Sequence, residues 1–160
     1  MKFGPLPLDR AEGAILAHSV GLPSGRLRKG QTLNAAHLAE MAGQGMESVI
    51  CARLDPGDIG EDEAAARLAA ALVPDPGAAC LRLTRPFTGR VNLIATGPGV
   101  LRLEAGILTA LNRIHPMLTL ATVPDFQQMG QGGMAATVKV IAYGLPEAAV
   151  AEAEALLRGR

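Results

Sequence analysis

The segment Pro74-Asp75-Pro76-Gly77 limits most strongly how this 160-residue chain can fold. Each proline lacks a backbone N–H and disfavours helix in the residue before it, so no helix or interior strand runs through the segment. The glycine that follows favours a turn. We therefore predict two small lobes, residues 1–76 and residues 77–160, joined at this break.

Hydrophobic periodicity and capping residues predict short helices and strands on both sides of the break. In the first lobe, Asn34 is the expected N-cap of a helix that reaches about Gly43. A second helix follows Gly60, where three acidic residues suit the positive end of the helix dipole. In the second lobe, residues 90–95 and 135–143 alternate in the manner of strands. This order of elements predicts an α+β (mixed α/β) fold.

The composition excludes several classes of protein. Fifteen Lys and Arg balance fifteen Asp and Glu, so the chain lacks the basic excess that nucleic acids and anionic membranes attract. Three Phe, one Tyr and no Trp leave little for stacking on bases. No apolar run reaches the ~18 residues of a membrane span, and Pro5, Pro7 and Asp9 stand where an export signal needs an apolar stretch. We expect a cytoplasmic protein that binds neither nucleic acid nor membrane.

The cysteines and acidic residues have simple structural explanations. Cys51 and Cys80 each lie in an apolar string without a second Cys or a His at ligand spacing, so we expect two buried thiols, no disulfide and no zinc site. An acidic cluster could instead hold a hard cation such as magnesium. A turn followed by a helix start already explains it, because acids suit the positive end of the helix dipole, so we predict no metal. The cluster comprises Asp58, Glu61, Asp62 and Glu63.

The best candidate for a ligand site is a set of three polar residues in the second lobe. Lys139 interrupts the strongest predicted strand, and Arg90 and Asn92 share one face of another. If the two strands are neighbours, a guanidinium, an amide and an ammonium group could hold an anion. Alternatively, Lys139 marks a solvated face or protects an edge strand from aggregation. We predict no catalytic residue.

Several strings in the sequence resemble a known family. The run from Arg26 to Leu54 resembles the segment of molybdopterin molybdenumtransferases and gephyrin-like proteins that precedes their molybdopterin-binding domain. The strings AEGAILAHS, FTGRVNLIA and MAATVKVIAY resemble the N-terminal region of a bacterial subgroup of molybdopterin-binding proteins.

The resemblance implies a role in molybdenum cofactor biosynthesis. It implies no cofactor in this chain itself, because the pterin site of these relatives lies in a following domain. That domain has a Thr/Ser-Gly-Asp/Glu motif, and Thr96-Gly97-Pro98 of this chain lacks the acidic third residue. We therefore expect a truncated, non-catalytic module whose relatives continue past Arg160. Such a module would serve dimerisation or the positioning of a molybdopterin-binding domain in cis. The alternative is a small anion- or phosphate-binding protein, or a hydrolase, that uses Arg90, Asn92 and Lys139.

Overall fold

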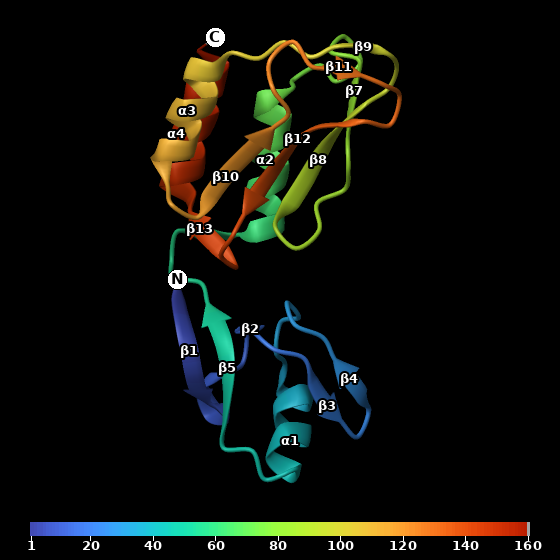
Figure 1. The fold of residues 1–160 in the computed structure, drawn as a ribbon. Helices are drawn as coiled ribbons and strands as arrows, with labels where there is room; N and C mark the ends of the chain where they lie inside the picture. Colours follow the sequence, from blue (N-terminus) through green and yellow to red (C-terminus); the bar gives the residue numbers. More distant parts are fainter. Residues whose placement is uncertain (160) are drawn as a thin grey trace. The chain divides into compact units, whose positions relative to one another are not determined.

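The computed structural model describes residues 1–159 and confirms the α+β class (Figure 1). The chain divides into two compact units, Met1–Asp58 and Ile59–Arg160, each with its own apolar core. Arg160, at which the predicted second lobe ends, lies outside the described residues. None of the helices within residues 1–159 is long and apolar enough to cross a membrane.

The first unit is a small three-stranded antiparallel sheet with one α-helix and a hairpin. Its elements are β1 (Lys2–Pro7), η1 (Leu8–Arg10), β2 (Ile15–Leu16), β3 (Val20–Leu22), β4 (Gly25–Leu27), α1 (Ala35–Gly43) and β5 (Ser48–Arg53). The sheet has the order β1-β5-β2, and β3 pairs with β4. The predicted cap of α1 is confirmed, because Asn34 Oδ1 accepts from the His37 N–H at 2.9 Å while His37 Nδ1 accepts from the Asn34 N–H at 3.3 Å.

The second unit is built on a four-stranded antiparallel sheet of order β10-β12-β8-β7. The elements from the boundary onward are β6 (Asp58–Gly60), α2 (Glu61–Leu72), β7 (Leu81–Leu83), β8 (Arg90–Ala95), β9 (Gly99–Val100), α3 (Ala105–Ile114), β10 (Leu118–Thr122), β11 (Gln128–Met129), β12 (Met134–Val140), β13 (Gly144–Pro146) and α4 (Glu147–Arg158). Two short pairs, β11-β9 and β13-β6, complete the pairing.

The three helices of the second unit pack against one face of this sheet (Figure 1). Helix α2 contacts β8 and β12, α3 contacts β10, and α4 packs on α2 and α3. The core therefore contains alternate strand residues, among them Val91, Leu93, Val138 and Val140. The intervening residues lie on the other face of the sheet, which none of the three helices of the second unit covers.

The boundary between the units differs from the predicted one. Pro74–Gly77 does interrupt the chain, because α2 ends at Leu72 and β7 begins at Leu81. However, Ala64, Ala65 and Leu68 of α2 are buried in the core of the second unit. The helix before the break therefore belongs to the same unit as the strands after it, and the prediction of a first lobe of residues 1–76 is wrong.

Candidate functional site

The structure brings the three predicted site residues together. Strands β8 and β12 are neighbours, with Arg90 opposite Lys139 and Asn92 opposite Thr137. All four side chains lie on the sheet face without helices, because Val91 and Val138 between them point into the core. Strand β12 lies in the interior of the sheet, so the alternative that Lys139 protects an edge strand is wrong.

The Lys139 ammonium group already has partners within the protein. Its Nζ donates to the Thr88 carbonyl oxygen at 2.5 Å and lies 3.9 Å from Glu61 Oε2. The next residue in the same turn, Gly89, donates its N–H to Asp62 Oδ1 at 2.6 Å. These contacts join the turn between β7 and β8 to the start of α2. Lys139 therefore has a structural role, and part of its charge is already balanced.

The other two predicted residues differ in their hydrogen bonding and exposure. Asn92 Oδ1 accepts from the Thr137 hydroxyl at 2.8 Å, and the Asn92 N–H donates to Thr84 Oγ1 at 2.9 Å. Arg90 is exposed. The three residues therefore form a cluster in which Arg90 is the most accessible charge. That this cluster binds an anion stays a prediction.

The cysteines occupy two different environments. Cys51 on β5 is buried, and burial raises the pKa of its thiol. Cys80 is exposed, so the prediction that both thiols are buried is wrong for this residue. The physical reason is local, because Cys80 has a φ of 52° in the turn that precedes β7. Among residues 1–159, no group of three or more His, Cys, Asp or Glu side chains could hold a metal ion.

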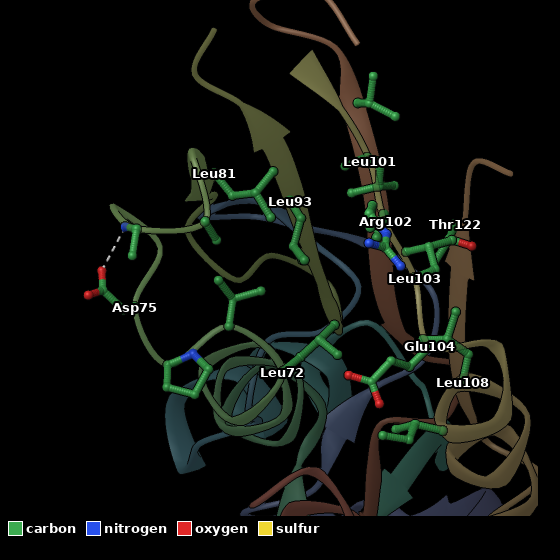
Figure 2. A pocket seen from close by; sticks show the side chains of 18 residues that line it. Leu72, Asp75, Leu81, Leu93, Leu101, Arg102, Leu103, Glu104, Leu108 and Thr122 are labelled. Atoms are coloured by element: carbon green, nitrogen blue, oxygen red, sulfur yellow. Dashed lines mark hydrogen bonds between the residues drawn. The ribbon is translucent and has the colours of Figure 1, made fainter. Parts of the chain in front are cut away.

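A cavity of about 660 Å³ lies on the helix-covered side of the second unit's sheet (Figure 2). Six leucines from several elements line it, together with two alanines of β12. The residues that line it are Leu72, Val73, Pro74, Asp75, Ala78, Ala79, Leu81, Leu93, Val100, Leu101, Arg102, Leu103, Glu104, Ile107, Leu108, Thr122, Ala135 and Ala136.

The cavity exists because two helices stop short of the same part of the sheet. Helix α2 ends at Leu72, where Pro74 prevents another turn, and α3 begins only at Ala105. The strand residues beneath this gap include Ala135 and Ala136, whose methyl groups are too small to fill it. The sequence thus leaves a hollow in an otherwise apolar core layer.

Four polar side chains lie around this hollow. Asp75 is engaged in its own turn, where Oδ1 accepts from the Ala78 N–H at 3.0 Å (Figure 2). Thr122 lies at the end of β10. Arg102 and Glu104 lie two residues apart in the segment that leads into α3, and both are exposed. The site is therefore an apolar space with one cation, Arg102, and two carboxylates, Asp75 and Glu104, at its edge, and within residues 1–159 the Glu104 carboxylate forms no ion pair.

Arg102 is held by an aromatic ring from a neighbouring segment. Its guanidinium carbon lies 5.1 Å from the centre of the Phe126 ring, a cation–π distance. Asp125 Oδ1 accepts from the N–H groups of Leu103 and Phe126 at 2.8 and 3.0 Å, and Phe126 N–H donates to the Leu101 carbonyl at 2.8 Å. These bonds join the two segments side by side.

Sequence reasoning did not find this cavity. Its lining comes from positions between Leu72 and Ala136, and only the tertiary fold brings them together. One local signal was available in Leu101-Arg102-Leu103-Glu104, which alternates apolar and charged residues directly before a helix.

The fold and the cavity define a small α+β protein with a space of ligand size in its second unit. A family model described as a domain of unknown function, DUF8806, matches residues 5–53, which lie within the first unit. The matched segment includes the pairing of β1 with β5 from Pro5 to Pro7 and the whole of α1. No curated protein and no solved structure matches the chain.

Proposed function

We propose that this chain is a binding module whose second unit takes a small, mostly apolar organic molecule in the cavity between α2, α3 and the sheet. The cavity itself carries the proposal. Its volume of about 660 Å³ lies within the range of ~300–1,000 Å³ that is typical of small-molecule sites. An apolar wall with a few polar groups at its edge is the usual composition of such sites.

The driving force for binding would be the removal of apolar surface from water. Leu81, Leu93 and Leu108 surround the space from three elements (Figure 2). Each apolar Å² that ligand and wall cover together contributes roughly 25 cal/mol. A flat aromatic or short aliphatic body suits this wall better than a sugar or a nucleotide, whose many polar groups would lack partners there.

A neutral fluorescent probe, N-phenyl-naphthylamine, tests the proposal. We expect saturable binding to one site on the full chain. Ala79→Trp places an indole at the exposed edge of the cavity and should weaken binding by about tenfold or more, since filling the space removes the apolar contacts. Ala151→Trp, on the exposed side of α4, is the matched control and should leave affinity unchanged. Equal effects of the two substitutions would refute the cavity as the site.

We also propose, from the sequence resemblance, that the module serves molybdenum cofactor biosynthesis in the cytoplasm as a non-catalytic part of a molybdopterin-binding protein. It would support dimerisation or position a pterin-binding domain. The strings that carry the resemblance occur in both units, which supports a role for the whole chain. Co-purification of the chain with a molybdopterin-binding domain produced from a separate gene tests this. If the two never associate and their fusion is no more active than the separate domain, the role is refuted.

A second candidate function is anion binding on the open face of the sheet. The register that places Arg90 opposite Lys139 favours it. Calorimetric titration with a phosphorylated pterin and with sulfate tests it, using Arg90→Ala. Arg113→Ala, on the exposed surface of α3, is the control. Loss of binding only in the Arg90 variant would support the site, and equal affinity in both variants would exclude it.

A further inference from the structure

We infer that the molecule in this cavity is an amphipathic monoanion, an aryl or alkyl carboxylate or sulfonate, whose charged group is bound by Arg102 at the edge. This inference rests on the proposed function, because it assigns a chemical class to the ligand of the same cavity. It depends on the charges around the opening and on how Arg102 is held there.

Arg102 offers hydrogen-bond donors that the protein does not use. Within residues 1–159, its guanidinium forms no ion pair with a carboxylate, and its described contact is with the face of the Phe126 ring. A ring face orients the planar guanidinium and leaves its N–H edges open. Those edges match the two oxygens of a carboxylate or sulfonate.

The position of Arg102 is supported by an unusual backbone conformation beneath it. Phe126 has a φ of 59°, which disfavours residues with a bulky side chain, and its ring is 64% exposed. Asp125 and the Leu101 carbonyl hold this conformation through the hydrogen bonds described above. Phe126 is the third residue of a β-turn that the Gln127 N–H closes by donating to the Pro124 carbonyl at 3.2 Å, and glycine or asparagine is the usual residue where φ is positive there. The turn therefore accounts for the backbone conformation but not for the aromatic side chain, and the ring of that side chain contacts the Arg102 guanidinium.

Two carboxylates at the edge, those of Glu104 and Asp75, limit the ligand to a single negative charge. The Glu104 side chain makes no capping hydrogen bond and is exposed at the start of α3. It follows Arg102 by two residues, so both side chains lie along one short segment of the edge (Figure 2). A dianion such as a phosphate monoester would be repelled by Glu104 more strongly than a monoanion is. The apolar wall then takes the body of the molecule.

A pair of probes that differ only in charge separates the inference from the proposed function. Anilinonaphthalenesulfonate carries one sulfonate, and N-phenyl-naphthylamine has the same ring system without it. Arg102→Gln should weaken sulfonate binding by about five- to tenfold and leave the neutral probe unchanged. Arg113→Gln removes a similar exposed charge far along α3 and should change neither affinity. Glu104→Gln should strengthen sulfonate binding about twofold, and added salt should weaken it.

Each outcome has a definite meaning. If both probes bind and Arg102→Gln changes neither affinity, the anion inference is overturned while the cavity remains a binding site. Equal weakening of both probes by Arg102→Gln would show that Arg102 stabilises the apolar wall and does not bind the sulfonate. This result would also overturn the anion inference. If neither probe binds saturably to the unaltered chain, the proposed function itself fails. Thermal melts followed by circular dichroism establish that each variant is folded.

Discussion

At the residue scale, the strongest polar link in the second unit joins two helices. Arg67 on α2 donates from Nε and Nη2 to the two carboxylate oxygens of Glu154 on α4, at 2.9 and 3.0 Å, and from Nη1 to Glu147 at 3.2 Å. The Glu154 side chain is only 13% exposed. Hydrogen bonds from Arg67 lower the pKa of this carboxyl group below its ordinary value.

This pair predicts how stability depends on pH. A carboxyl group with a lowered pKa in the folded state stabilises the protein above its unfolded pKa of about 4.3, and the contribution is lost as pH falls through the folded value. Glu154→Gln should therefore cost about 1 kcal/mol of unfolding free energy at pH 7 and have a smaller effect at pH 3. Urea unfolding at both pH values measures it. Glu147→Gln, at a 58% exposed position, is the control, and an equal loss from both would contradict the account.

At the scale of elements, the six-residue connection between β7 and β8 ends in a two-residue turn, Thr88-Gly89, that links the sheet to α2. Phe87 and Arg90 exchange backbone hydrogen bonds at 3.1 and 3.2 Å across the turn. The turn residues Thr88 and Gly89 have φ values of 49° and 69°, as hairpin turns of the primed types require. A Cβ atom on Gly89 would lie 2.5 Å from the Val140 carbonyl oxygen and 2.6 Å from Glu61 Oε2.

Two substitutions in this turn should have opposite effects. Gly89→Ala should destabilise the protein by about 2 kcal/mol, because it adds both an unfavourable φ and a backbone clash. Thr88→Asn should be neutral or stabilising by a few tenths of a kcal/mol, because Asn tolerates positive φ better than a β-branched residue. Thermal unfolding of both variants measures the difference. A Gly89→Ala variant as stable as the unaltered protein would show that the turn is not held against α2.

The elements also show what could be predicted from sequence. Helices α1 and α2 carry their own start signals, Asn34 and the acids after Gly60, so local chemistry identified both. The sequence does not reveal that β8 and β12 are neighbours, since pairing between strands distant in the chain depends on the whole fold. The cavity could not be predicted, because it results from the absence of side chains above Ala135 and Ala136. The predicted domain boundary is wrong because Pro74–Gly77 only ends a helix, whereas a domain boundary depends on the core into which each element packs. Helix α2 packs into the core of the second unit.

At the scale of the whole molecule, the chain consists of two units with separate small cores. A unit as short as Met1–Asp58 buries only about 60% of the surface of its unfolded chain, so its stability alone is marginal. The net charge of zero does not oppose association. We therefore expect the chain to self-associate.

Sedimentation velocity over a range of concentrations tests this expectation. We predict that the sedimentation coefficient rises with concentration and reaches a dimer or higher species at tens of micromolar. The same runs with about 0.5 M salt separate apolar from electrostatic association, because screening affects only the latter. A single monomeric species at every concentration would contradict the prediction.

The central claim is that the cavity on the helix-covered side of the sheet in the second unit binds a small amphipathic monoanion. The most direct test is a titration of the ¹⁵N-labelled full chain with anilinonaphthalenesulfonate, followed by amide chemical shifts. The account predicts saturable shifts that are largest around the cavity, at Leu81, Leu93, Leu103 and Leu108. Shifts that are largest at Thr119, Thr137 and Lys139 on the open face, or that spread evenly over both units, would contradict it.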